Sequence, residues 1–289
     1  MDKNSVCVAR YIRKLCGGSQ SFLAEASDGF TYVVKFANNP QGPNVPFNES
    51  MGSELYRACG LPGPKWKPLL VTDEFLVQNP ACWLEMPTGR LVPNEGWCFG
   101  SRFLGTQDKR LLEILPGAYI GRIRNLWSFW LAWIIDFSGD HADRRQALFE
   151  ERPGRHLNTF FIDHGHLFGG PKGDIRDNLR ACRYLDSRVY RELSSRNISE
   201  ILNRLRALDV DLLWQRTMKL PSEWKTKSAL ASFTECLNRV SHAQLMQTLV
   251  DEMVQSHIRS AICESALDIP PVLHPGVQNK SRGFTRNES

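Results

Sequence analysis

The sequence of 289 residues lacks the segments that mark membrane and secreted proteins. Its longest apolar stretch, from Leu126 to Ile135 with Ser128 inside it, is about half of the roughly 20 residues that a helix needs to cross a bilayer. The chain does not begin with a basic segment followed by a long apolar run, so no secretory signal is expected. We therefore interpret the apolar stretch as a buried helix and expect a cytoplasmic protein without a membrane partner.

Paired cysteines and concentrated charge are missing as well. The eight cysteines include no Cys-x-x-Cys pair and no Cys/His cluster at zinc-finger spacing, which argues against a zinc module. The formal net charge of +5 is spread along the chain, so nucleic acid is not an expected partner. The sequence contains no internal repeat, and only the residues after about 270 lack a packing pattern, which predicts a flexible tail at 271–289.

The periodicity of the apolar residues changes near residue 105. The first hundred residues alternate with period two between turn signals, whereas the residues beyond about 107 follow helical periodicity. This order predicts an α+β fold with a strand-rich N-terminal lobe at 1–104, containing one helix, and a mainly helical C-terminal lobe at 105–270. The expected strands are Val8–Leu15, Phe22–Ala26, Phe30–Phe36, Leu69–Val71 and Trp97–Phe99. The expected helices are Phe47–Cys59, Ile120–Phe137, Ile175–Leu193, Ile198–Met218, Lys225–Arg239 and His242–Ile258.

A glycine loop precedes a hairpin that ends in a lysine. The loop Gly17-Gly18-Ser19-Gln20-Ser21 offers close backbone approach, N–H groups and hydroxyls to phosphate oxygens. Asp28-Gly29 suits the tight turn that leads into the third strand, at whose end Lys35 stands. Lys35 alone could be an exposed lysine at a strand end, but Glu49 at the start of the next helix indicates the lysine–glutamate pair with which kinases hold nucleotide phosphates. Glu54 is a second candidate for the glutamate.

Four carboxylates form the other notable group. Asp136, Asp140 and Asp143 follow the apolar helix, and Asp163 follows a short apolar strand. Such a group suits a base for a hydroxyl together with ligands for a hard cation such as magnesium. The alternative is a capping and ion-pair cluster with the neighbouring Arg144-Arg145. Asp163 favours function, because a carboxylate between large apolar residues and a His-Gly turn is costly to bury without a partner.

Short motifs occur in a fixed order between about residues 8 and 170. They are Gly17-Gly18-Ser19-Gln20-Ser21, Asp28-Gly29, Tyr32-Val33-Val34-Lys35-Phe36, Asn39-Pro40-Gln41-Gly42, Asn48-Glu49, Gly60-Leu61-Pro62, Ala142-Asp143 followed by Arg145-Gln146-Ala147-Leu148-Phe149, and Ile162-Asp163-His164-Gly165. This ordered set closely resembles the HipA-like kinase domains of the protein-kinase-like superfamily.

The resemblance implies a role for each matching residue. Lys35 and Glu49 form the nucleotide-positioning pair. Asp143 is the catalytic aspartate. Asp163 binds magnesium, and Gln146 assists at the metal. The glycine-loop residues Gly17, Gly18, Ser19, Gln20 and Ser21 contact the nucleotide phosphates, and Ser101 and Arg102 belong to the hinge that contacts adenine.

The resemblance also implies an activity and partners. We expect a bilobal kinase fold that binds ATP and Mg²⁺ and transfers the γ-phosphoryl group to a hydroxyl acceptor. Protein serine or threonine, a small-molecule alcohol and a sugar stay open as acceptors, with protein favoured. An antitoxin-like regulator is a possible partner by the same resemblance.

Two positions depart from the family pattern. The family carries an asparagine two residues before its catalytic aspartate, where this chain has His141. This change leaves open whether the preceding Asp140 shares or replaces the role of Asp143. Protein kinases proper place an asparagine five residues beyond that aspartate, where this chain has Leu148. The alternative hypothesis is therefore a pseudokinase that binds nucleotide and acts as a regulatory scaffold.

Overall fold

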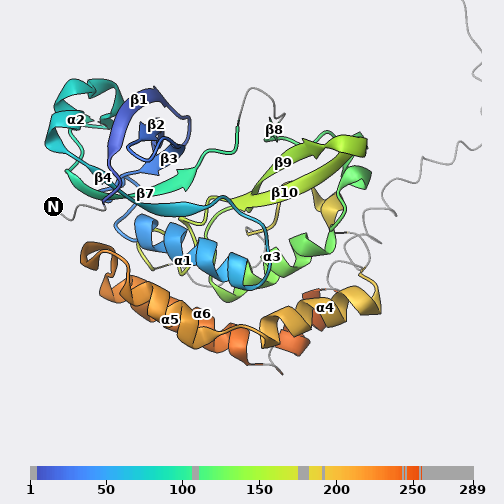
Figure 1. The fold of residues 1–289 in the computed structure, drawn as a ribbon. Coiled ribbons are helices and arrows are strands. Elements are labelled where there is room, and N and C mark those ends of the chain that lie inside the picture. Colours follow the sequence, from blue (N-terminus) through green and yellow to red (C-terminus); the bar gives the residue numbers. More distant parts are fainter. Residues whose placement is uncertain are drawn as a thin grey trace, which may run out of the picture.

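A five-stranded antiparallel sheet in the order β1-β2-β3-β7-β4 forms the N-terminal lobe (Figure 1). The computed structural model describes residues 5–105, 111–174, 182–190, 193–242, 244, 246–253 and 255. The turn between β2 and β3 uses Gly29, whose φ of 78° suits glycine, and the N–H of Ala26 donates to the carbonyl of Phe30 at 2.9 Å. The strands are β1 (Val8–Lys14), β2 (Phe22–Ala26), β3 (Thr31–Lys35), β4 (Trp66–Val71) and β7 (Gly96–Arg102).

The two faces of this sheet have different tasks. Residues paired across neighbouring strands point to the same face. Leu23, Val33 and Ser101 form one such row, and Lys35 pairs with Phe99 on the same face. The other face forms the small core of the lobe from Phe22, Ala24, Tyr32, Val34, Phe36, Leu69 and Cys98. The sheet therefore presents Lys35 away from its own core.

Helix α1 (Val45–Ala58) runs between the sheet and the helices α5 (Val210–Met218) and α6 (Lys227–Ser241) (Figure 1). Pro46 stands in its first turn, where the missing N–H costs nothing, and Gly60 ends it with a φ of 74°. The ring centroids of Phe47 and of Phe233 on α6 are 5.7 Å apart. α1 is thus packed by both lobes.

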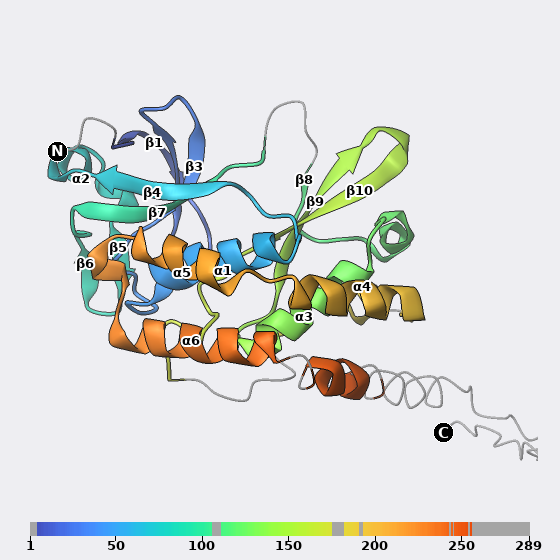
Figure 2. The same cartoon turned by 60° about the horizontal axis from the view of Figure 1, so that its bottom comes forward.

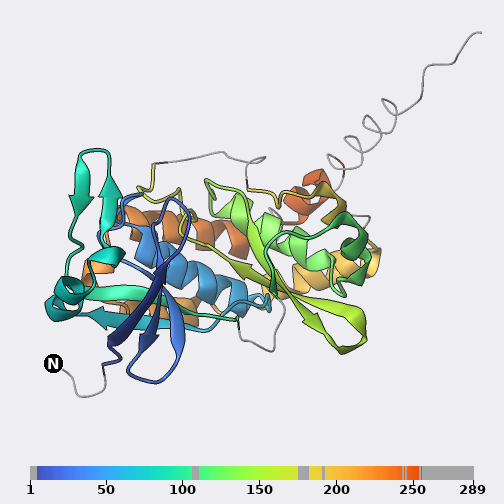
Figure 3. The ribbon, with the colours of Figure 1, turned by 90° about the horizontal axis from the view of Figure 1, so that it is seen from above.

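The C-terminal lobe combines helices with a three-stranded sheet. Trp130 and Trp133 on α3 lie at the centre of a large apolar core. The sheet has the order β10-β9-β8, and the β9–β10 hairpin extends at one end of the molecule (Figure 3). The elements are β8 (Leu111–Leu112), α3 (Trp127–Ser138), β9 (Gln146–Arg152), β10 (His156–Ile162), α4 (Ser195–Arg206), α5 (Val210–Met218) and α6 (Lys227–Ser241). In the second view, α6 lies along the lower side of α1 (Figure 2).

An insertion between β4 and β7 was not expected from the sequence. Its helix α2 (Asp73–Gln78) is capped by Thr72, whose hydroxyl accepts from the N–H of Phe75 at 3.2 Å. Strands β5 (Leu84–Met86) and β6 (Gly89–Leu91) follow. This insertion packs beside β1, and Gln20 of the glycine loop binds the backbone of Glu85 on β5.

The α+β, bilobal fold expected from the sequence is confirmed, but three helix boundaries are wrong. The first turns expected at Ile120 form a separate short helix, Gly117–Arg122, and α3 begins at Trp127. The helix expected at Ile198–Met218 is two helices, because Asp209 caps a new start by accepting from the N–H of Leu212.

The third error concerns the helix expected at Ile175–Leu193. Its described residues, 182–190 and 193, contain only the short helical turn Ser187–Val189, and the other residues of this range lie outside the described part of the chain. Residues 246–253 of the last expected helix are helical, whereas the tail at 271–289 lies outside the described residues.

Within the described part of the chain, no helix has the length and apolar character needed to span a membrane.

Candidate active site

Lys35 lies between two carboxylates from different parts of the chain. Its Nζ atom contacts Glu49 of α1 and lies 2.8 Å from Oδ1 of Asp163, which follows β10. The lysine side chain is only 8% exposed. Burial acts to lower the pKa of Lys35, but the charges of Asp163 and Glu49 outweigh it and raise the pKa above its ordinary value. Lys35 is therefore a fixed positive charge.

The two carboxylates differ in their surroundings. Glu49 is buried, and its Oε2 accepts a hydrogen bond from the N–H of His164 at 3.1 Å. Burial raises the pKa of Glu49, and the charge of Lys35 acts against this increase. Asp163 keeps 29% of its side chain exposed. Burial acts to raise the pKa of Asp163, but Lys35 lowers it well below its usual range, so this carboxylate is ionised and available to a cation.

Gln146 is the second side chain at Asp163. It is the first residue of β9 and pairs in register with Ile162, the last residue of β10. Its Nε2 donates to Oδ2 of Asp163 at 2.7 Å. Asp163 itself has a φ of 60°, in the left-handed region that a non-glycine residue rarely adopts. The structure thus brings together Lys35, Glu49, Asp163 and Gln146.

A buried arginine connects the loops on either side of the β9–β10 hairpin. Arg145 binds both oxygens of Asp136 and donates from Nη1 to the carbonyl of Ile162 at 2.7 Å. The hydroxyl of Tyr56 on α1 also donates to Asp136, at 2.6 Å. Asp136 therefore belongs to an ion pair, as the alternative interpretation of the carboxylate cluster predicts, and its role is structural.

Asp143 and Asp140 occupy different environments. Asp143 is exposed, and its Oδ1 accepts from the N–H of Arg144 at 2.7 Å. Asp140 is buried with a φ of 48°, and its Oδ2 lies 3.0 Å from Nη1 of Arg239 on α6. Sequence reasoning missed Arg239, since a lone arginine on an amphipathic helix gives no signal of this contact.

His141 occupies the position where the resembling family has asparagine. The side chain is buried, and its Nδ1 contacts the backbone of Asp143. The next residue, Ala142, donates its N–H to the carbonyl of His166 at 2.9 Å, which ties this loop to the segment after Asp163. The backbone is therefore held at Ala142 and at Asp143 itself.

The glycine loop is anchored from two sides. Gly17 has a φ of 126°, which requires glycine, and Gly18 is exposed beside it. The carbonyl of Ser19 accepts from Nδ2 of Asn39 at 3.1 Å. Gln20 and the backbone of Glu85 on β5 exchange two hydrogen bonds of 2.6 Å each. The side chain of Gln20 thus holds the loop against the insertion, and the buried Ser21 pairs through its carbonyl with Leu15.

The two expected hinge residues lie on opposite faces of β7. Ser101 pairs with Val33 and shares the face of Lys35. Arg102 pairs with Tyr32, and its guanidinium carbon lies 3.6 Å from the centroid of the Phe30 ring. The structure therefore places Ser101, and not the Arg102 side chain, on the lysine side of the sheet.

The donor set around Asp163 fits magnesium better than a closed metal site. Among the described residues, no three His, Cys, Asp or Glu side chains gather into a group that could hold a metal ion. Mg²⁺ is usually held by one or two carboxylates together with substrate phosphates and water. The ionised Asp163 meets this pattern, and Lys35 beside it suits a phosphate. Gln146 faces Asp163 with its amide N–H, so its amide would have to turn for the oxygen to meet a bound metal ion.

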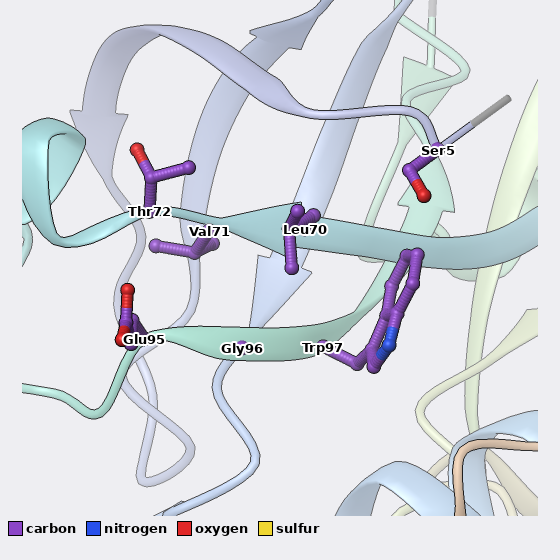
Figure 4. Close-up of a pocket in the computed structure, with 7 residues that line it drawn as sticks. All are labelled: Ser5, Leu70, Val71, Thr72, Glu95, Gly96 and Trp97. Carbon is purple, nitrogen blue, oxygen red and sulfur yellow. The ribbon is translucent and has the colours of Figure 1, made fainter. Parts of the chain in front are cut away.

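A hollow of about 500 Å³ lies elsewhere, at the β4 edge of the sheet (Figure 4). Its lining residues are Ser5, Leu70, Val71, Thr72, Glu95, Gly96 and Trp97. Figure 4 shows that they come from β4, the start of β7 and the segment before β1. None of the residues proposed for chemistry lines this hollow.

Comparison of the fold with solved structures identifies kinases. A proinflammatory kinase of Helicobacter pylori, CtkA, aligns with a TM-score of 0.51 and 12% identity over 85% of this chain and 96% of that chain. A Golgi casein kinase aligns with a TM-score of 0.40 at 14% identity over 93% of this chain and 75% of that chain. The same enzyme with Mn/ADP bound gives a TM-score of 0.36 at 14% identity over 88% and 73%.

The likeness to the Helicobacter pylori kinase shows a protein-kinase-like fold. At this identity it carries no information on activity or substrate. No protein-family model matches the sequence, and a search of curated proteins finds no match either.

Proposed function

We propose that this chain is an ATP- and magnesium-dependent phosphotransferase that transfers the γ-phosphoryl group to a hydroxyl. The observation that carries the proposal is the buried Lys35, whose Nζ binds Glu49 and Asp163 at once. A lysine of the sheet, a glutamate of the following helix and a metal-binding aspartate are the parts that kinases bring together at nucleotide phosphates. The kinase-like fold of the chain supports this interpretation.

Each residue of the site has a defined task in the proposed reaction. The charge of Lys35 stabilises negative charge on the α- and β-phosphates, and Glu49 holds Lys35 in place. Asp163 and Gln146 would hold magnesium, which when bound neutralises charge on the phosphate oxygens. The exposed carboxylate of Asp143 orients the acceptor hydroxyl and accepts its proton, since it is free to face an incoming group.

The position of Asp140 favours Asp143 as the base. Asp140 is buried and paired with Arg239, so its carboxylate would need to leave this ion pair to reach a substrate. In this proposal Asp140 shapes the loop. The backbone amides and hydroxyls of the glycine loop contact the phosphates, and Ser101 lies near adenine. The proposed lobes are 1–104 and 105–270.

The resemblance to HipA-like kinases supports the finer part of the proposal. It favours a protein serine or threonine as acceptor and an antitoxin-like protein as regulator.

One observation favours a second candidate, the pseudokinase. Leu148 stands where protein kinases place the asparagine that holds a second metal ion, so that position offers no amide oxygen. His141 replaces the asparagine of the resembling family, and its ring contacts the backbone of Asp143. Such a protein would bind nucleotide without turnover.

ATP turnover distinguishes these two functions. Wild type, Asp143→Asn and Asp163→Asn are compared with Mg²⁺ or Mn²⁺, while mass spectrometry follows phosphate added to the chain or to a test protein. Turnover that both substitutions abolish supports the kinase. Thermal stabilisation by nucleotide without turnover supports the pseudokinase, and absence of nucleotide binding with either metal ion rejects both.

A further inference from the structure

The segment that follows Asp163 has a strained backbone. Asp163 has a φ of 60° and Phe168 a φ of 54°, followed by Gly169 at 77° and Gly170 at 82°. A non-glycine residue in the left-handed region costs roughly 1–3 kcal/mol and persists only where its surroundings enforce it. Asp163 and Phe168, five positions apart, therefore need support from the surrounding structure.

Asn48 on α1 supplies that support. Its Nδ2 donates to the carbonyls of Gly165 at 3.0 Å, Leu167 at 2.6 Å and Gly170 at 3.1 Å. The residue is fully buried, with 0% of its surface exposed. One amide group has two hydrogens, so three carbonyls share them. This single side chain thus binds the strained segment at three carbonyls.

Stability alone explains this residue poorly. The Oδ1 atom of Asn48 is buried and finds no hydrogen-bond partner among the described residues. An unsatisfied buried acceptor is unfavourable, by about 1–3 kcal/mol. Asn48 is therefore better explained by the three carbonyls that it binds than by its contribution to the free energy of unfolding.

Asn48 stands beside the glutamate of the lysine pair. Glu49 accepts from the N–H of His164, so two consecutive residues of α1 bind the segment directly after Asp163. The same segment reaches the other loop, because the carbonyl of His166 accepts from the N–H of Ala142. The position of this segment, which Asn48 helps to fix, thereby affects Asp163 at its start and Ala142, the residue before Asp143.

We propose that Asn48 is a positioning residue that holds the segment 163–170 so that the Asp163 carboxylate is preorganised for the metal ion. The inference rests on the proposed function, since it assigns the metal to Asp163. Asn48 contacts neither the nucleotide nor the metal in this proposal, and it acts through the backbone of the segment.

Metal affinity tests this role without an activity assay. We would measure binding of Mn²⁺ in the presence of ADP by electron paramagnetic resonance, and binding of ADP without metal by calorimetry. Asn48→Ala removes the three contacts. Gly170→Ala disturbs the same segment from its other side, because alanine disfavours the φ of 82°. Ser50→Ala is the matched control, since the buried Ser50 hydroxyl donates to the carbonyl of Pro46 within α1 itself.

We expect Asn48→Ala and Gly170→Ala each to weaken Mn²⁺ binding by about 10- to 100-fold, the range seen for outer-shell residues. Metal-free ADP binding stays within about twofold, and the double variant is no weaker than the single ones because both act through one segment. Ser50→Ala behaves like wild type in both measurements.

Two results would overturn the positioning role of Asn48. A folded Asn48→Ala variant that binds Mn²⁺ like Ser50→Ala overturns the role of Asn48. If Asn48→Ala does not fold, unchanged metal affinity in Gly170→Ala overturns it. A wild type that binds ADP and Mn²⁺ leaves the proposed function standing in either case, whereas a wild type that binds neither rejects the proposed function and this inference together.

Discussion

Arg145 and Asp136 form a bidentate ion pair in the interior, with Nε and Nη2 of the arginine 2.8 and 2.7 Å from the two carboxylate oxygens. The side chains are 1% and 0% exposed. Arg145 also binds the carbonyl of Ile162, so one guanidinium joins the end of α3, the start of β9 and the end of β10. The loops that carry Asp143 and Asp163 are therefore held at a fixed separation.

Removing Arg145 should destabilise the protein strongly. In Arg145→Met, Asp136 stays behind as a buried charge without its cation, and breaking a buried pair in this way costs about 3–5 kcal/mol. Urea unfolding measures the loss. Arg144→Met is the control, since Arg144 is exposed and its replacement should change the free energy of unfolding by less than about 0.5 kcal/mol. A loss below about 1 kcal/mol in Arg145→Met would contradict the structural role of the pair.

The fold was predictable where local patterns and burial agree. β1, β2 and β3 and the helix that carries Glu49 follow from alternation, from Asp28-Gly29 and from Gly60, since each signal acts within a few residues. The kinase-like fold followed from motif order. The helix break at Asp209 was missed because an amphipathic pattern continues across a single capping residue.

The contacts that fix the site were less accessible to sequence reasoning. Asp140 and Arg239 are 99 residues apart, and Gln20 and Glu85 are 65 apart. Neither pair produces a spacing pattern, because each depends on how two elements pack. The sequence could propose Asp140 and Gln20 as site residues from their neighbours, but only the tertiary structure assigns partners to their side chains.

Asp140 and Asp143 should respond differently to the loss of charge. Asp143→Asn removes the proposed base, so kcat should fall by about 10²- to 10⁴-fold. Asp140→Asn keeps the shape of the loop and weakens the pair with Arg239, so kcat should stay within about tenfold of wild type. Steady-state ATP turnover compares the two. An equal loss in both variants would show that Asp140 shares the role of base.

His141 should make the stability depend on pH. Burial, reinforced by the charge of Arg145, lowers the pKa of His141 from its ordinary 6.5 to about 4. Between these values the unfolded chain binds the proton and the folded protein does not, so stability falls as the pH decreases from 6.5 to 4. At about 1.4 kcal/mol per pH unit, the loss reaches about 3 kcal/mol at most.

His141→Asn isolates this contribution, because asparagine does not titrate. Urea unfolding of both proteins across the window from 6.5 to about 4 should show a steeper loss of stability in wild type than in the variant. Equal pH dependence of the two proteins would mean that His141 is protonated as easily in the folded as in the unfolded state.

Gln20 should set the affinity for ATP without entering the chemistry. Its side chain exchanges two hydrogen bonds with the backbone of Glu85, and its own φ of 48° belongs to a loop that needs support. Gln20→Ala releases the glycine loop from β5, so nucleotide binding must then order the loop. Two hydrogen bonds are worth about 1–2 kcal/mol together, so KM for ATP should rise roughly 5- to 30-fold.

The split between KM and kcat distinguishes this anchoring role from a catalytic one. An anchor that acts equally on the bound nucleotide and on the transition state changes KM and leaves kcat unchanged. Gln78→Ala on α2 is the matched control, because Gln78 is exposed and donates to Glu74 within its own helix. If Gln20→Ala lowers kcat with KM unchanged, the Gln20 side chain contributes to the transition state, and the insertion at 73–91 then has no part in holding the glycine loop for ATP.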